Sequence, residues 1–196
     1  KRLLTRFTNR KTPKKIAEPF YMCENPRYAG HKIGKYTYGK PLISRSDRTT
    51  RLMIGSYCSI ADDVCFLLGG EHRTDWVTTY PFNVLFSEAK HITGHPASKG
   101  DIIVGNDVWI GQNVTVMPGV HIGDGAIIAA NSVVVKDIPP YHIAGGNPCK
   151  IVKKRFDDEL IEFLLTIKWW DWSPYKIFDN HGILCSGDLA KIKELR

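Results

Sequence analysis

The sequence predicts an all-β solenoid, a parallel β-helix, because one long stretch of the chain repeats every six residues. Between Val104 and Pro139 the chain divides into the blocks VGNDVW, IGQNVT, VMPGVH, IGDGAI, IAANSV and VVKDIP. A period of six fits neither a helix, which repeats every ~3.6 residues, nor a flat strand, which alternates every two. It is typical of short strands that turn a corner and stack on the strand one coil away.

The composition of the blocks supports the same fold. The leading residues are all β-branched: Val104, Ile110, Val116, Ile122, Ile128 and Val134. The fifth residues are small or apolar: Val108, Val114, Val120, Ala126, Ser132 and Ile138. β-Branched side chains suit the half-buried surface of a pleated strand. The Gly and Asn residues between them are expected to supply the positive φ of the tight corners.

The β-helix is expected to span residues 21–150, with an irregular first coil and one interruption. Residues 20–50 contain only a hint of the repeat, and terminal coils are expected to be atypical. The repeat resumes over residues 54–66, but Val104 follows Ile54 by 50 residues, which is not a multiple of six. We therefore expect a projecting loop at about residues 69–100. A long excursion from a rigid solenoid is usually functional.

Two further segments flank the repeat. Residues 1–20 are expected to form a basic N-terminal arm. Residues 151–196 are expected to form a C-terminal helical tail, in which Asp157 lies at the start of one helix and Ser173-Pro174 opens a second. Such a tail would cap one end of the solenoid and cover its open edge.

The net charge of +7 lies in the arm. Seven of the 27 Lys and Arg residues precede Glu18 without any acid among them, and the other 20 balance 20 Asp and Glu. The arm is expected to be a solvated terminus, with an anionic surface or polymer as its alternative partner. The body is neutral, and we expect no nucleic-acid partner.

The cysteines and the hydropathy indicate a cytoplasmic protein. Five scattered cysteines without a C-x-x-C pair argue against a disulfide framework or a zinc ribbon and favour a reducing compartment. No run of 18 apolar residues predicts a membrane span, and no apolar segment suggests a signal peptide. The chain begins at Lys1 without Met, so the sequence leaves open whether a further segment precedes it.

Histidines in the expected loop are the first candidates for chemistry. His72 lies in G-G-E-H-R-T-D-W, and an imidazole can act as a general base near neutral pH. Taken alone, such a histidine is more often a surface residue. His91 and His95 lie four apart, but Gly94 and Pro96 oppose the helix that would align them as metal ligands. We expect no metal.

Other candidates are open to two interpretations. Trp109 either packs in the core or lines a groove. Tyr36 and Tyr38 alternate with Thr37, so they are expected to share one face of a strand. The basic cluster of Lys150, Lys153, Lys154 and Arg155 is expected at a helix start, where cations are unfavourable unless they meet an anion such as a phosphate.

Several common catalytic motifs are absent from the sequence. It contains no G-x-S-x-G elbow, no P-loop and no G-x-G-x-x-G. Acyl-serine, nucleotide-hydrolysing and dinucleotide-dependent enzymes therefore gain no support.

Five motifs in order resemble the xenobiotic acetyltransferases, hexapeptide-repeat enzymes that include chloramphenicol and streptogramin acetyltransferases. The motifs are G-G-E-H-R-T-D-W, G-N-D-V-W-I-G, V-M-P-G-V-H-I-G, G-G-N-P-C-K-I-V-K-K-R-F and W-W-D-W, and the likeness covers residues 52–185. The resemblance implies a left-handed parallel β-helix, a homotrimer with active sites between subunits, and acetyl transfer from acetyl-CoA without a metal.

The resemblance also implies roles for single residues. His72 matches the family's catalytic histidine, and Trp109 matches the tryptophan near its active-site groove, where it is expected to contact coenzyme A. Related sugar acetyltransferases imply coenzyme A contacts at Gln112, Ala130, Val135, Lys136, Lys150 and Lys153. Acceptor contacts are expected from Tyr36, Tyr38, Glu71 and Trp76. His72 would take a proton from the acceptor, which then attacks the thioester directly.

The upstream region departs from the antibiotic-modifying enzymes. It is shorter and reads YAGHKIGKYTYGKPLISRSDRTTR, with many hydroxyl and charged groups. We therefore expect a sugar or glycan acceptor, in surface-polysaccharide biosynthesis, with an antibiotic as the alternative. Two other classes stay open. One is an anhydrase-like solenoid with zinc on His72, His91 and His95, and the other is a non-catalytic scaffold.

Overall fold

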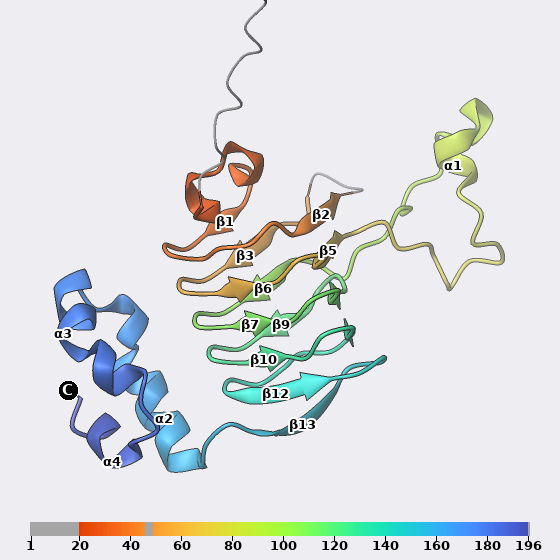
Figure 1. The fold of residues 1–196 in the computed structure, drawn as a ribbon. Helices are drawn as coiled ribbons and strands as arrows, with labels where there is room; N and C mark the ends of the chain where they lie inside the picture. Colours follow the sequence, from red (N-terminus) through yellow and green to blue (C-terminus); the bar gives the residue numbers. More distant parts are fainter. Residues whose placement is uncertain (1–19, 46–48, 196) are drawn as a thin grey trace, which may run out of the picture.

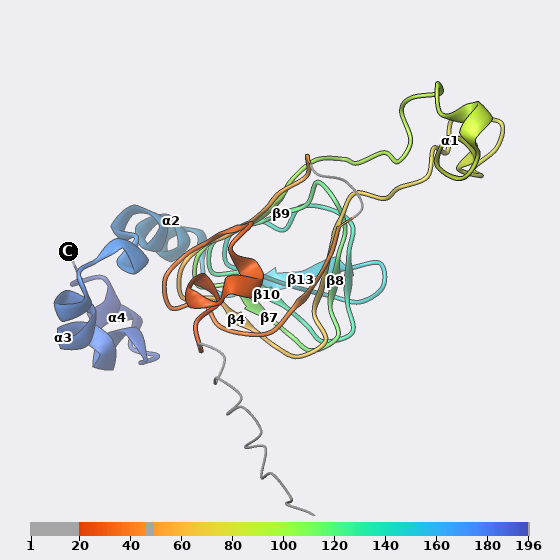
Figure 2. The same ribbon diagram turned by 90° about the horizontal axis from the view of Figure 1, so that it is seen from above.

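A three-sided coil of short strands forms the body of the protein (Figure 1). The computed structural model describes residues 20–45 and 49–195, so the expected basic arm lies outside the described residues except for Phe20. Viewed from above, the coil has a triangular outline, with the insertion and the C-terminal helices outside it (Figure 2). Within the described residues the strands form three sheets.

The chain visits the three sheets in turn. The first sheet contains β1 (Lys32–Ile33), β3 (Leu52–Ile54), β6 (Ile102–Val104) and β9 (His121–Ile122). The second contains β4 (Ser59–Ile60), β7 (Trp109–Ile110), β10 (Ile127–Ile128), β12 (His142–Gly145) and β13 (Lys150–Lys154). The third contains β2 (Leu42–Arg45), β5 (Cys65–Leu68), β8 (Thr115–Val116) and β11 (Val133–Val134). The pairs within the sheets are parallel, except that β12 and β13 run antiparallel.

Each coil consists of three six-residue blocks. Ile103 pairs with His121, Trp109 with Ile127, and Thr115 with Val133, so every block stacks on the third block after it. The leading and fifth residues of all six blocks are buried in one continuous core. Ser132 is the polar member of this set, and its hydroxyl donates to the Ala129 carbonyl at 2.6 Å and accepts from Gly146 N at 3.0 Å.

One corner of the coil is a column of residues with left-handed backbone. Tyr57, Asp107, Gly125 and Tyr141 have φ values of 61°, 55°, 65° and 54°. Their amide groups donate to the preceding coil, for example Tyr141 N to Asp124 O at 2.8 Å. Tyr and Asp residues thus take this conformation beside Gly125, whereas Asn113 and Asn131 take it at a second corner.

The glycines that follow the leading residues were expected to supply positive φ, and for Gly105 this is wrong. Its φ is not positive, but a Cβ there would lie 2.6 Å from Asp124 N on the next coil. Gly105 is required because the coils approach closely, and its conformational freedom is not used.

The two ends of the coil differ from its middle. At the N-terminal end, the short 3₁₀ turns η1 (Met22–Glu24) and η2 (Pro26–Tyr28) bury Met22 and Tyr28 over the first coil, which agrees with an atypical terminal repeat. At the other end β13 pairs with β12, so Lys150–Lys154 is an extended strand. The expectation that the basic cluster starts a helix is therefore wrong.

The C-terminal helices lie beside the corner column (Figure 2). They are α2 (Asp158–Ile167), η4 (Trp169–Asp171), α3 (Pro174–Leu184) and α4 (Leu189–Ile192). Asp157 caps α2 by accepting from Leu160 N at 2.8 Å, and Ser173 accepts from Lys176 N at 3.3 Å. Leu160, Leu164 and Trp170 pack with Tyr141 in a second apolar cluster, so these helices cover a side of the coil instead of closing its end.

Candidate functional site

The segment between β5 and β6, which includes His72 and α1 (Phe82–Leu85), projects as an arm outside the coil (Figures 1 and 2). A bridge between Glu71 and Ala97 closes its neck, with backbone hydrogen bonds of 3.0 and 2.8 Å. Its tip contains α1 and the 3₁₀ turn η3 (Ser87–Ala89). The tip exposes many apolar side chains: Val77, Tyr80, Phe82, Val84, Leu85, Phe86 and Ile92. Such a surface is typical of a contact with another protein surface.

The hydrogen bond of His72 defines its tautomer. Its Nδ1 atom lies 2.6 Å from the Thr79 carbonyl oxygen, which can only accept, so Nδ1 carries the hydrogen in the neutral ring. Nε2 therefore presents a lone pair. The His72 ring is exposed and meets the His95 ring edge-on, with 4.8 Å between the centroids. This arrangement suits a general base that awaits a substrate.

Contacts between neighbouring side chains stabilise the loop around His72. The Arg73 guanidinium pairs with Asp75 and lies over the Trp76 ring, 5.3 Å from its centroid. Glu71, expected to contact the acceptor, instead forms an ion pair of 3.2 Å with Lys99 at the neck. The Trp76 ring centroid lies 6.4 Å from that of His95, so this expected acceptor contact lies beside the imidazole pair.

Trp109 lies on the outer surface of the second sheet. It pairs with Ser59 and Ile127 in neighbouring coils, and Tyr38 extends the row through a bridge to Ser59. Its side chain is 54% exposed, so of the two interpretations left open by the sequence the core is excluded.

A cavity of about 500 Å³ lies at the edge of this sheet. Its lining residues are Phe20, Tyr38, Gly39, Lys40, Ile60, Ala61, Asp62 and Gln112. It brings together Tyr38, an expected acceptor contact, and Gln112, an expected coenzyme A contact. Phe20 stacks on Tyr38 with ring centroids 5.3 Å apart, which gives the cavity an aromatic wall.

Tyr36 does not join Tyr38, and the expectation that they share a strand face is wrong. Tyr36 has a φ of 63°, so the chain turns a corner between the two rings. The Tyr36 ring packs instead on Tyr21 and Tyr57, at 5.5 and 4.9 Å between centroids.

The expected coenzyme A contacts divide into separate groups. Gln112 and Ala130 meet at one corner, where Asn131 N donates to the Gln112 carbonyl at 2.9 Å. Val135 and Lys136 follow β11 and are exposed at the opposite edge of the third sheet.

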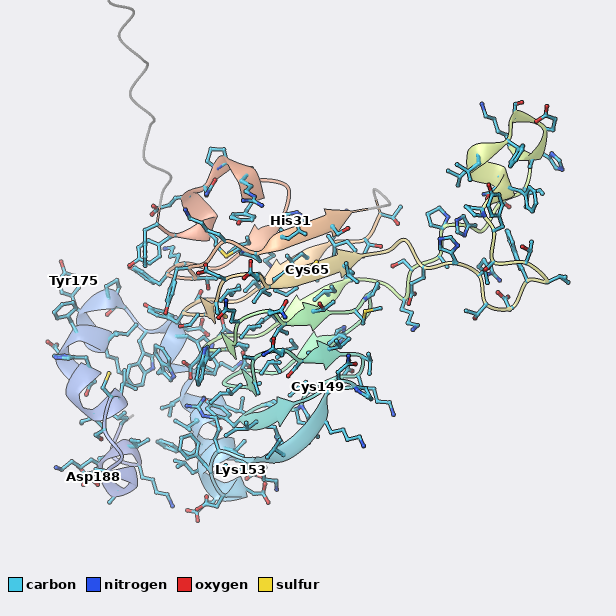
Figure 3. All side chains as sticks on the ribbon, turned by 45° about the vertical axis from the view of Figure 1, so that its right-hand side comes forward. His31, Cys65, Cys149, Lys153, Tyr175 and Asp188 are labelled. Carbon is cyan, nitrogen blue, oxygen red and sulfur yellow. The ribbon has the colours of Figure 1, made fainter. Side chains whose placement is uncertain are left out.

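The lysines of β13 lie at the far end of the coil from the N-terminal turns. Figure 3 shows Lys153 near the last strands, whereas His31 lies at the opposite end. Lys150 and Lys153 are exposed, but Arg155 is not part of this group, because its guanidinium packs over the Tyr141 and Phe156 rings. The two lysines are available to anions such as phosphates.

The described residues hold no group of three or more His, Cys, Asp or Glu side chains arranged to bind a metal ion. His72 and His95 are in contact, but nothing places His91 with them as a third ligand in this part of the chain. None of the helices in the described ranges is long and apolar enough to cross a membrane.

Sequence reasoning missed some residues of the cavity. Asp62 precedes the corner residue Asp63 as Gln112 precedes Asn113, and the two blocks stack on each other. Aligning residues 60–64 with 110–114 would have identified it. Phe20 and Lys40 lie outside clean repeats, so no periodicity indicated them.

Comparisons with known proteins found a matching family model, curated relatives and solved structures. Residues 101–136 match the family described as bacterial transferase hexapeptide (six repeats). A chloramphenicol acetyltransferase of Klebsiella aerogenes is 40% identical and aligns over 86% of this chain and 89% of its own. A protein of Lysinibacillus sphaericus named "Probable macrolide acetyltransferase" is 57% identical over 69% of this chain and 78% of its own. A maltose O-acetyltransferase structure from Clostridium difficile 630 is 28% identical, with a TM-score of 0.47 over 65% of this chain and 60% of that one.

Proposed function

The chain belongs to the xenobiotic acetyltransferases, the hexapeptide-repeat enzymes that transfer an acetyl group from acetyl-CoA, and from this membership we propose that it acetylates a hydroxyl group of an antibiotic-class small molecule. Acetyltransferase activity follows from the family. The acceptor, the residues of the site and the assembly are the proposal.

The hydrogen bond between His72 Nδ1 and the Thr79 carbonyl is the main support for the mechanism. It leaves Nε2 as the base that takes the proton of the acceptor hydroxyl while the oxygen attacks the thioester carbonyl. The same ring then returns the proton to the departing thiolate. A backbone N–H would stabilise the negative oxygen that forms between the two events. No nucleophile on the protein is needed, because the acceptor attacks directly.

A second copy of the chain would complete the site. In one chain His72 stands on an arm outside the coil, whereas the cavity lined by Tyr38 and Gln112 lies on the coil. The exposed apolar tip of the arm and the exposed Trp109 suit a contact between copies. We place three copies around an axis, with left-handed coils side by side and the arm of each over the cavity of its neighbour.

The donor would lie in the groove between neighbouring coils. Gln112 and Ala130 line it from one copy, whereas Val135 and Lys136 line it from the other, which would reunite the two separated pairs. Lys150 and Lys153 would attract the phosphates of coenzyme A, since both are exposed at the end of the coil.

The acceptor is the point on which the sequence and the relatives differ. The hydroxyl-rich and charged upstream segment predicts a sugar, and that prediction stands untested. The names of the relatives and the Phe20–Tyr38 stack favour a less polar ligand, since an aromatic wall binds apolar surface. We therefore place amphenicols, macrolides and streptogramins before sugars.

The test is an acceptor panel with acetyl-CoA and detection of the free thiol. It contains chloramphenicol, a macrolide, a streptogramin, maltose and a galactoside. We expect turnover with an antibiotic and little with either sugar. Turnover with sugars alone would reverse the acceptor assignment. If none of the five compounds leads to thiol release, the proposed acceptor classes are wrong, but the membership of the family is not affected.

A variant tests the role of His72 on the best acceptor. His72→Ala should lower kcat by about 10²–10⁴-fold while acetyl-CoA still binds. His91→Ala, in the same loop and also exposed, is the matched control and should retain the parental rate. A His72→Ala enzyme with more than about half of the parental kcat would exclude this residue as the base.

A further inference from the structure

The hydrogen bond of His72 does not by itself fix the plane of the ring. The torsion that turns an imidazole about its bond to Cβ is broad and does not select one orientation. The bond from Nδ1 to the Thr79 carbonyl restrains one edge of the ring, but a carbonyl oxygen accepts over a wide range of directions. The side chain is exposed, so core packing does not hold it either. A catalytic group must be held to within roughly 0.5 Å and 10–20° of its productive geometry.

The ring of His95 supplies the further restraint. It meets the His72 ring edge-on, with 4.8 Å between the centroids and 74° between the planes. Rings at this separation are in contact, so the His72 imidazole cannot turn toward His95 without a clash. The contact therefore limits the rotation that the hydrogen bond leaves free.

The backbone around His95 is anchored to two other parts of the arm. The His95 carbonyl accepts from Asn83 Nδ2 at 3.0 Å, which connects it to α1. The carbonyl of the preceding residue, Gly94, accepts from Arg73 Nη1 at 3.3 Å. His95 is also half-buried, whereas His72 is exposed. Of the two rings, that of His95 is therefore the one suited to support the other.

We propose that His95 is a positioning residue for acetyl transfer: its ring holds the His72 imidazole in the plane in which Nε2 meets the acceptor hydroxyl. The inference rests on the proposed function, because it takes His72 as the base. His95 itself carries no proton in the reaction. Its side chain contacts His72 and, at 6.4 Å between centroids, Trp76, in both cases through the ring. Its role thus depends on the flat shape of the ring and not on its nitrogen atoms.

Two substitutions separate the shape of the ring from its nitrogen atoms. His95→Ala removes the ring, and His95→Phe replaces it with a flat ring that has no nitrogen. On the best acceptor, His95→Ala should lower kcat by about 10-fold to 10²-fold, as a small misplacement of a reacting group does, and leave KM for acetyl-CoA unchanged. His95→Phe should restore most of the loss. A parental kcat in His95→Ala, or a His95→Phe enzyme that is equally slow, would overturn the proposal.

A double variant distinguishes the failure of this inference from the failure of the proposed function. If His95 acts only through His72, combining His95→Ala with His72→Ala should give an enzyme no slower than His72→Ala alone. A further loss in the double variant would overturn the positioning role. A slow His72→Ala enzyme beside a parental His95→Ala enzyme would overturn this role alone. A His72→Ala enzyme with the parental rate would refute the base, and the positioning role with it.

NMR relaxation of the His72 ring tests the restraint without any acceptor. The ring signal is assigned by its absence from His72→Ala, and its order parameter reports how closely the ring is held. The order parameter should fall in His95→Ala and recover in His95→Phe. His91→Ala, in the same loop and exposed, is the matched control and should leave it unchanged. Parental ring order in His95→Ala would overturn the proposal, and His95→Gln, which also lacks a ring, gives the same comparison if His95→Ala does not fold.

Discussion

At the scale of single residues, Asp107 is an acid whose charge the fold opposes. Burial raises its pKa from 3.8 to about 6, although Arg155 beside it acts in the other direction. The folded protein therefore holds this proton more tightly than the unfolded chain does. Between about pH 4 and pH 6 the native state binds more protons, so the contribution of Asp107 to stability falls as the pH rises.

Urea unfolding of the parent and of Asp107→Asn across this range tests the effect. The free energy of unfolding of the parent, relative to the variant, should decrease from about pH 4 to pH 6 and then level off. The amide does not titrate, so the variant supplies the baseline. A difference that stays constant over the whole range would show that the carboxyl is not perturbed.

The Tyr141 hydroxyl predicts a stabilising substitution. Tyr141→Phe removes a buried donor that has no partner among the described residues, so the unliganded protein should gain roughly 1 kcal/mol in free energy of unfolding. Tyr28→Phe is the matched control. It is equally buried, but its hydroxyl donates to the Pro41 carbonyl at 3.3 Å, so its loss should destabilise. Denaturant titrations measure both, and a less stable Tyr141→Phe protein would contradict the assignment.

At the scale of elements, replacing a glycine by alanine is expected to have opposite effects on stability in the corner column and in the C-terminal helices. Gly125 has a φ of 65° and leaves room for the Tyr141 ring, so Gly125→Ala should destabilise by roughly 2 kcal/mol or more. Gly182 lies inside α3, and a Cβ there would meet no neighbour within 4 Å among the described residues outside its own helix. Gly182→Ala should therefore stabilise by about 0.5–1 kcal/mol. Thermal unfolding of the two variants should shift in opposite directions, and similar shifts would contradict this account of the corner.

The elements also differ in how far the sequence predicts them. The repeat identifies the core residues of β7 to β11 because each of these two-residue strands has one leading residue that must point inward. The same reasoning does not identify β13. All five of its residues are exposed, so no alternation of apolar and polar side chains marks it as a strand, and its lysines instead suggested a helix start.

At the scale of the whole molecule, we predict a trimer of about three times 22.2 kDa, which light scattering can measure. Mixed trimers test the shared site. Copies with His72→Ala lack the base, and copies with Tyr38→Arg lack a usable cavity, so neither assembly alone should be active. Co-assembly would pair an intact arm with an intact cavity and restore part of the activity. No recovery in confirmed mixed trimers would place each site within a single chain.

The same scale explains why the site was harder to predict than the fold. The period of six relates residues that stack one coil apart, so it predicts the core. It says nothing of Arg155, which meets Asp107 and the Gly125 carbonyl only because the chain returns to the corner after β13. His72 was indicated by its motif, but no sequence pattern shows what lies opposite a side chain on an arm that leaves the coil.

The position of the insertion also bears on the order of folding. Asn106 contacts the next coil at Asp124, 18 residues away, but contacts the preceding coil at Ser56, 50 residues away. Closing the longer loop costs about 0.9 kcal/mol more in chain entropy, by the logarithmic dependence on loop length. The uninterrupted coils after β6 are thus favoured to close first. The coils before β6 then pair with coils that have already formed. The arm that contains His72, which lies between the two groups of coils, adds only a small entropic cost.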